Sequence, residues 1–109
     1  MNLTLAFEKP NRIADRILAT DRLSYGGVSQ ALHHSLGPVA RPLRDGVEWL
    51  DENGQSIRIN DLYGEQLTYV RAGQLIPHLE TTASSDWEKS VVAFVRTLPA
   101  STRVVLWWH

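Results

Sequence analysis

The C-terminal segment STRVVLWWH, residues 101–109, constrains the fold more than any other part of the chain. Its apolar residues alternate so that, in a β-strand, they occupy both faces. The two sets are Val104, Leu106 and Trp108 on one face, and Val105 and Trp107 on the other. Such a strand needs other elements packed on both of its faces, because large aromatic side chains left exposed promote aggregation or binding. We expect a central strand whose tip reaches either a sheet edge or a dimer interface.

The segment SSDWEKSVVAFVRTLP, residues 84–99, predicts a helix directly before this strand. Ser85 and Glu88 have the spacing of a capping box, and Pro99 ends the run. At 100° per residue the apolar side chains form one stripe, which consists of Trp87, Val91, Phe94, Val95 and Leu98. We expect a helix over about 86–98 that packs this stripe on the core.

The middle of the chain, GVEWLDENGQSIRIN at 46–60, predicts a β-hairpin. Asn53-Gly54 tolerates the positive φ angles of a two-residue type I′ turn. That turn would place Leu50 opposite Ile57, and Trp49 opposite Arg58 as a cation–π pair. A third strand is expected at 66–72, followed by a connection over 73–84 that contains Pro77.

The first 38 residues predict a strand followed by two helices. LTLAF at 3–7 has the composition of a strand. PNRIADRILATDRL at 10–23 offers Asn11 as a helix N-cap, with apolar residues at helical spacing behind it. VSQALHHSLGP at 28–38 offers a second helix that Gly37-Pro38 ends.

Together these elements predict a single globular α+β domain over residues 1–109, in the order βααβββαβ. The sheet is expected to be mostly antiparallel, with the Asn-Gly hairpin and a C-terminal helix–strand unit packed on it. Strand 66–72, helix 86–98 and strand 103–108 would be able to form a right-handed parallel crossover.

Composition excludes several functional classes. The chain has no cysteine, which rules out disulfides, thiol catalysis and cysteine-ligated metal centres. Its net charge is −1, so no global basic field recruits nucleic acid. The start lacks a basic region before its short apolar stretch, and no apolar run has the roughly 18 residues of a membrane helix. We expect a cytoplasmic protein with no cofactor and no membrane partner.

The most suggestive motif is the histidine pair in QALHHSLGP at 30–38. Neighbours on a helix point about 100° apart, so His33 and His34 do not chelate one metal ion, and no metal site is predicted. Instead they share a polar helix face. With Arg41 and Arg44 in the loop that follows, this face would be able to recognise an anion, a base edge or a carboxylate.

No catalytic set converges in the sequence. GVSQA at 27–31 resembles a nucleophile elbow only faintly, because no buried strand precedes its serine. Glu48 is the best acid–base candidate, provided that its strand face packs on the core. Catalytic residues are therefore not assigned.

These observations favour a small, non-enzymatic, intracellular protein that binds another protein, such as an inhibitor, immunity or accessory protein. Aromatic residues are preferred anchors at interfaces. The predicted binding residues are His33, His34, Arg41, Arg44, Trp107 and Trp108. A second copy of the chain is a further candidate partner.

Two alternatives remain open. Helix, helix and hairpin is the element order of a winged-helix DNA-binding regulator. Against it, the reading helix carries no Arg or Lys and the wing tip DENG is acidic, so nucleic acid is less favoured than protein. The second alternative is a small enzyme that uses histidine and glutamate in a cleft.

Overall fold

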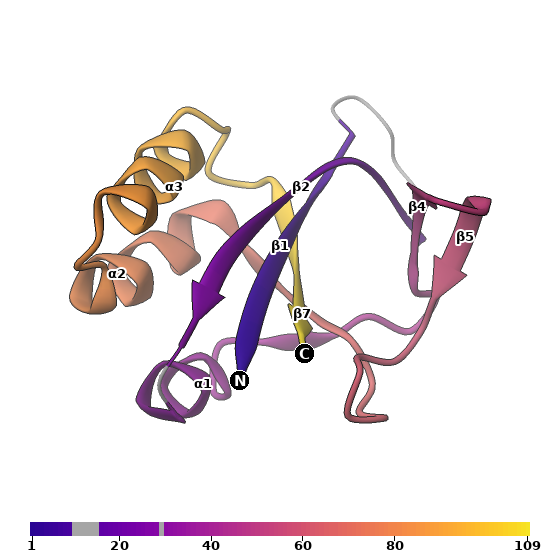
Figure 1. Cartoon of the computed structure of the whole chain (residues 1–109), viewed down its shortest axis with the longest axis horizontal. Helices are drawn as coiled ribbons and strands as arrows, with labels where there is room; N and C mark the ends of the chain where they lie inside the picture. Colours follow the sequence, from indigo (N-terminus) through magenta and orange to yellow (C-terminus); the bar gives the residue numbers. More distant parts are fainter. Residues whose placement is uncertain (10–15, 29) are drawn as a thin grey trace.

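The C-terminal strand β7 (Arg103–Trp108) is a central strand of the sheet, as its two apolar faces predict. It pairs antiparallel with β1 (Asn2–Glu8) on one side and with β6 (Thr68–Arg71) on the other. Figure 1 shows this arrangement in a computed structural model of the chain. The structure describes residues 1–9, 16–28 and 30–109, without the side chains of Thr20 and Asp51.

The described residues form a seven-stranded sheet in the order β3-β6-β7-β1-β2-β4-β5, together with three helices. All neighbouring strands are antiparallel except β2 and β4. The remaining elements are β2 (Ile17–Gly27), α1 (Gln30–Leu36), β3 (Arg41–Pro42), β4 (Val47–Asp51), β5 (Gly54–Arg58), α2 (Ala72–Thr82) and α3 (Asp86–Arg96). The predicted class is confirmed: a mixed α+β domain with a mostly antiparallel sheet, a hairpin and a C-terminal helix–strand unit.

The central strands β1 and β7 are covered on both faces. Helices α2 and α3 cover one face, while the sheet curls so that β4 and β5 lie away from them on the other side (Figure 1). The helix-side core takes one set of β1 and β7 side chains, namely Leu3, Leu5, Phe7, Val104, Leu106 and Trp108. The second core lies on the opposite face and contains Ala6, Ile17, Ala19, Leu43, Val47, Trp49, Leu67 and Val105. The alternation in β7 therefore serves two cores at once.

The helix predicted over 10–23 is wrong from Ile17 onward, because β2 occupies residues 17–27. Ile17 and Ala19 enter one core and Tyr25 enters the other, although simple alternation would place all three on one face. The register with β1 shifts twice along β2, as at β-bulges, and these shifts change the face that the side chains meet. Pairing with β1 along nearly the whole of β2 outweighs the helical spacing of the apolar residues. The predicted cap, Asn11, lies outside the described residues.

The connection predicted over 73–84 is helix α2 in the structure. Pro77 lies inside it, at a cost that is typically about 3 kcal/mol. Leu75 and Leu79, one turn apart, are fully buried and hold the helix on the core despite the proline.

The parallel crossover prediction is also wrong, because α2 adds a second helix between β6 and β7. The chain leaves the sheet along α2 and returns along α3, so β7 begins next to the point where β6 ends. Arg103 at the start of β7 therefore pairs with Arg71 at the end of β6, in an antiparallel ladder.

The hairpin at the Asn-Gly sequence is present, but its register differs from the predicted one. Trp49 lies opposite Ser56, and Asp51 lies opposite Gly54. The turn therefore encloses Glu52 and Asn53, and Gly54 supplies the positive φ of 98° just after it. The change of register is two residues, so every side chain keeps its predicted face of the sheet.

Helix α3 begins with the predicted capping box. Ser85 Oγ accepts a hydrogen bond from the Glu88 backbone N–H, and Glu88 Oε1 accepts one from the Ser85 N–H. The predicted core stripe is only partly buried: Val91 and Val95 are inside, whereas Trp87 and Phe94 lie at the rim with 53% and 39% exposure. No helix in the described part of the chain is long and apolar enough to cross a membrane.

The capping box predicts a pH-dependent contribution to stability. Hydrogen bonds from the Ser85 and Ser84 backbone lower the pKa of Glu88 below its usual value of 4.5. A lowered folded-state pKa contributes stability above the unfolded value and loses it as pH falls through the folded value. Glu88→Gln keeps an acceptor for the capping box but removes the charge, so we expect it to reduce the free energy of unfolding by about 0.5 to 1 kcal/mol at neutral pH, with a smaller difference near about pH 3.

Urea denaturation at both pH values measures this difference. Ser90→Ala is the control, since its hydroxyl only bonds the Asp86 carbonyl within the helix, and it should change stability by less than about 0.5 kcal/mol at either pH. A Glu88→Gln effect of equal size at both pH values would contradict the proposed role of the carboxylate.

Candidate functional site

The two C-terminal tryptophans have separate environments. Trp108 is 6% exposed in the helix-side core, which leaves little of its side chain available for the predicted binding role. Its position on the inward face of a central strand explains the burial. Trp107 is half-buried on the other face, edge-to-face with Trp49 and stacked on His109.

The histidine pair is exposed on α1, as the helical projection predicts. The His33 ring meets Trp108 edge to face, with centroids 4.7 Å apart. His33 also lines a groove of about 440 Å³ whose charged lining residues are Asp61 and Glu65. Its neighbours are thus acidic rather than basic.

The structure does not bring the predicted arginines into the His33 groove. Arg41 lies on β3 opposite Tyr69, and Arg44 lines a separate hollow that contains Arg103. The proposed anion-binding face of histidines and arginines is therefore split between two surfaces.

As to the His/Glu enzyme alternative, the hydrogen bonds of the described histidines do not join any of them to a glutamate. His78 Nδ1 bonds Ser35 Oγ at 3.1 Å, and His109 Nε2 bonds Thr4 Oγ1 at 2.9 Å. Glu80 pairs with Arg96, and Glu48 lies on the outer hairpin face beside the exposed Leu50 rather than on the core. Within the described ranges no group of three or more His, Asp or Glu side chains is placed to hold a metal ion.

The winged-helix alternative fails on element order. It requires two helices before the hairpin, whereas β2 occupies the position of the first. Element order therefore no longer supports this form of DNA binding.

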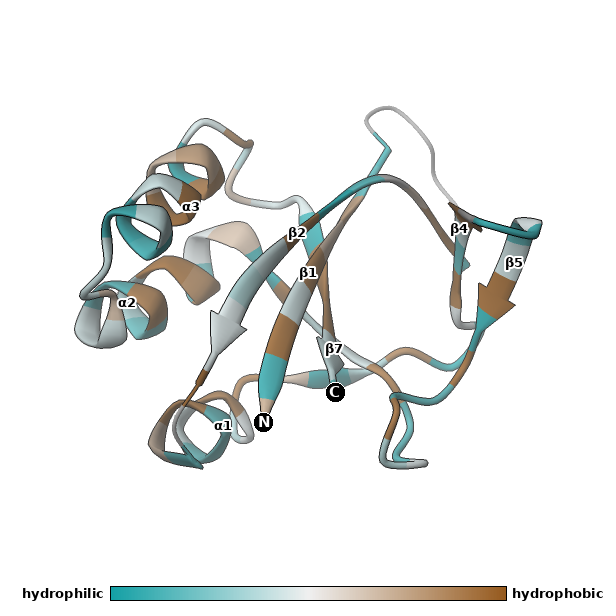
Figure 2. Ribbon diagram, viewed as in Figure 1, coloured by the Kyte–Doolittle hydropathy of each residue, from teal (hydrophilic) through white to brown (hydrophobic). Residues whose placement is uncertain are grey.

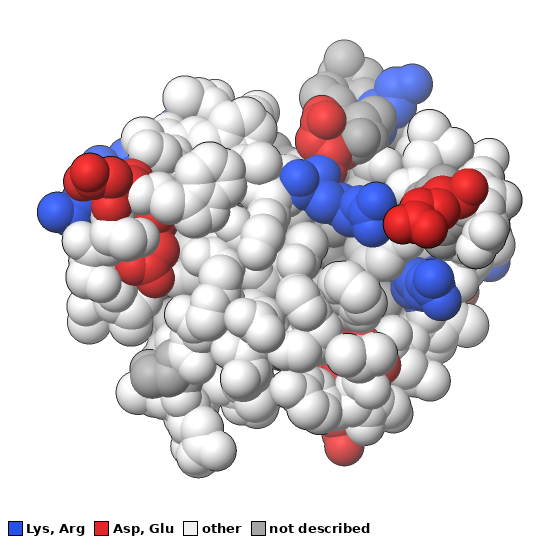
Figure 3. All heavy atoms as spheres, viewed as in Figure 1, with Lys and Arg blue, Asp and Glu red and all other residues white. Residues whose placement is uncertain are grey.

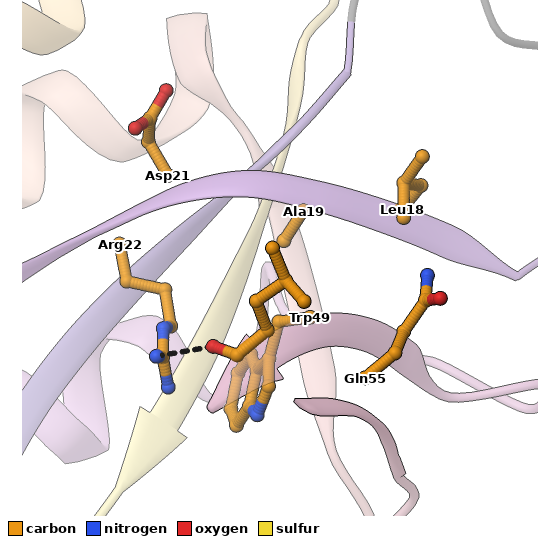
Figure 4. A pocket seen from close by; sticks show the side chains of 7 residues that line it. Leu18, Ala19, Asp21, Arg22, Trp49 and Gln55 are labelled. Carbon is orange, nitrogen blue, oxygen red and sulfur yellow. Dashed lines mark hydrogen bonds between the residues drawn. The ribbon is translucent and has the colours of Figure 1, made fainter. Parts of the chain in front are cut away.

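A groove lies in the seam between β2 and β4. These strands form a parallel ladder of only two residue pairs, Ile17 with Val47 and Leu18 with Glu48, and then separate. The groove occupies about 510 Å³ and is lined by Leu18, Ala19, Asp21, Arg22, Trp49, Leu50 and Gln55 (Figure 4). We call it the seam groove. Its volume lies within the range of small-ligand sites.

Arg22 bridges the seam groove from β2 to β4. Its Nη2 donates to the Leu50 carbonyl at 2.8 Å, and its guanidinium lies 4.6 Å from the centre of the Trp49 ring. The predicted cation–π partner of Trp49 is Arg58; in the structure Arg22 lies over the ring, and Arg58 lies opposite Val47. Figure 4 shows Arg22 reaching down to Trp49 while Asp21 projects from the other side of β2.

Charged side chains cluster near this seam. Figure 3 shows basic side chains over the junction between β2 and the hairpin, with acidic side chains beside them over β4 and β5. Among the side chains that the structure describes, no carboxylate forms an ion pair with Arg22. Its guanidinium contacts the Trp49 ring face and the Leu50 carbonyl.

A strip of exposed apolar side chains adjoins the seam groove. It consists of Leu50, Ile57, Ile59, Leu62 and Tyr63, which are between 46% and 71% exposed. We call this set the apolar strip. Figure 2 shows brown bands on β5 and along the segment that leaves it. Leu50 belongs to both the strip and the seam groove.

The two edges of the sheet differ. At one end, β3 has two residues, one of which is Pro42, so that edge offers little backbone for pairing. At the other end, β5 has five residues without proline and pairs in the described part of the chain only with β4. One member of the apolar strip, Ile57, belongs to β5 itself.

No protein family model, curated protein or solved structure matches this chain. Sequence reasoning also did not single out Arg22 or Leu50. No sequence motif contains them. They line the seam groove only because segment 17–27 is a strand and because β2 separates from β4 after two residue pairs.

The position of the hairpin depends on Gly46, directly before β4. Gly46 has φ 75°, and a Cβ there would lie 2.5 Å from the Arg58 backbone oxygen on β5. Gly64 has a similar φ of 80°, but a Cβ there meets no atom within 4 Å. The two glycines thus share a backbone conformation and differ in the space around them.

We expect Gly64→Ala to destabilise the protein by about 1 kcal/mol, from the positive φ alone. Gly46→Ala should cost at least about 3 kcal/mol, because the methyl group also displaces β5. Chemical denaturation measures both values. Equal losses would show that close packing of Gly46 against β5 is not required.

Proposed function

We propose that the protein acts by binding another protein, as a small inhibitor, immunity or accessory protein does, through the apolar strip. The observation that carries the proposal is the exposure of five large apolar side chains within one continuous segment, 50–63. Leu50 and Leu62 are the most exposed, at 71% and 70%. Apolar surface gathered in this way is typical of interaction sites.

The energetic argument is the removal of this surface from water. Burial contributes about 25 cal/mol for each Å² of apolar surface, so several large side chains provide a substantial driving force. The edge of β5 adds backbone donors and acceptors, which a partner strand is able to pair with.

The charges around the strip favour protein over nucleic acid. Glu48 and Glu52 lie on or beside the hairpin, and Asp61 and Glu65 flank Leu62 and Tyr63. Carboxylates here would repel phosphates, whose neutralisation requires several Lys or Arg contacts. A protein partner with apolar and basic side chains complements this surface.

The test compares two doubly substituted proteins. Ile57→Asp with Leu62→Asp places two charges in the apolar strip. Gln74→Asp with Thr81→Asp is the matched control, because it adds the same charge to exposed positions on α2, across the molecule (Figure 1). Both should stay within about 1 kcal/mol of the parent stability, since all four side chains are exposed.

Each protein is used for affinity capture from cells of the source organism, with quantitative mass spectrometry. We expect at least one protein to be recovered by the parent and the control, and about tenfold less by the strip variant, a loss of about 1.4 kcal/mol. A second copy of this chain would be detected as a partner in the same experiment. Equal recovery by all three proteins, or no specific recovery, would refute the proposal.

A further inference from the structure

The seam groove contains the positively charged side chain of Arg22, which two contacts hold in position. The Trp49 ring supports the Arg22 guanidinium, and the Leu50 carbonyl occupies one of its five N–H donors. A guanidinium fixed in this way loses little conformational entropy on binding a further acceptor. Among the described side chains, no carboxylate pairs with the remaining donors.

We propose that the seam groove binds a carboxylate group that is carried next to an apolar group. The planar fork of an arginine matches the two oxygens of a carboxylate and forms charge-assisted hydrogen bonds with them. Leu18, Ala19 and Leu50 provide aliphatic surface in the same groove. The Gln55 amide also lines it and is able to donate a hydrogen bond.

Asp21 is the group that opposes this ligand. It lines the groove, and its negative charge would weaken the binding of an anion. Successive side chains on a strand point to opposite faces, and Figure 4 shows the Asp21 carboxyl on the far side of β2 from Arg22. The Asp21 carboxylate therefore lowers the affinity for an anionic ligand but does not occupy the guanidinium donors of Arg22.

The carboxylate can come from two sources, a free organic acid or an acidic side chain of a protein. Leu50 belongs to both the seam groove and the apolar strip, so a bound protein segment would reach Arg22 without leaving the strip. The inference does not rest on the proposed protein-binding function, because the groove and Arg22 are defined without it.

The test titrates the complete, isotopically labelled chain with two matched pairs of probes. One pair is phenylacetate and phenylacetamide, which differ in charge but hardly in shape. The other is the blocked tripeptide Leu-Asp-Leu and its Leu-Asn-Leu counterpart. NMR shifts of the Arg22 Nε–H and the Trp49 Nε1–H report occupancy of the seam groove.

We expect each acid to saturate these signals with a Kd of about 1 mM, and each neutral partner to bind at least about tenfold more weakly. The tighter of the two acids indicates whether a free acid or a peptide is the better ligand. Equal binding of acid and neutral probes, or no saturation by either acid at about 20 mM, would overturn the proposal. Neither result depends on a partner being captured by the apolar strip.

Three variants assign the effect to named side chains. Arg22→Gln should weaken phenylacetate at least about tenfold, whereas Asp21→Asn should strengthen it about two- to fivefold. Arg96→Gln is the control, because Arg96 pairs with Glu80 on the helical side of the molecule, and it should leave the affinity unchanged. Parent-like affinity in a folded Arg22→Gln protein would overturn the proposal. If Arg22→Gln does not fold, the acid and amide comparison on the parent chain and the Asp21→Asn result decide it.

Discussion

The central pairing of β1 with β7 supports the rest of the structure. It joins the two ends of the sequence: the Asn2 N–H donates to the His109 carbonyl at 2.6 Å, and the His109 N–H donates back to Asn2 at 2.9 Å. Both strands contribute alternate side chains to two cores. Since every other strand is added outward from this pair, the helices on one face and the hairpin on the other depend on the same ladder.

Local chemistry explains which parts of this fold could be predicted from the sequence. The Ser85 and Glu88 cap, the Asn-Gly turn and the alternation in β7 each depend on near neighbours along the chain. Segment 17–27 was harder, because its strand forms only against β1 and its apolar spacing also suits a helix. Helix α2 was missed because Pro77 argues against it, while the burial of its leucines depends on contacts distant in sequence. The predicted fold class is nevertheless correct, because it depends on which faces of the strands and helices are apolar rather than on the assignment of each segment.

The site was less predictable than the fold for the same reason. His33 and Trp108 do meet, but as an edge-to-face contact at the surface of a core, and Arg41 and Arg44 lie elsewhere. The residues that form the seam groove come from β2, β4 and β5. Their juxtaposition requires β2 and β4 to pair briefly and then part, and no pattern within either segment encodes that separation.

The unequal edges of the sheet limit how the protein can assemble. The end formed by β3 is two residues long and contains Pro42, whereas the end formed by β5 is longer and free of proline. A sheet that is able to extend in both directions can propagate into a fibre, as edge-to-edge aggregates do. Extension from one end alone stops after a single added strand or a single symmetric pair. If a partner strand adds at the β5 edge, the short β3 edge would therefore favour a closed complex of defined size over a polymer.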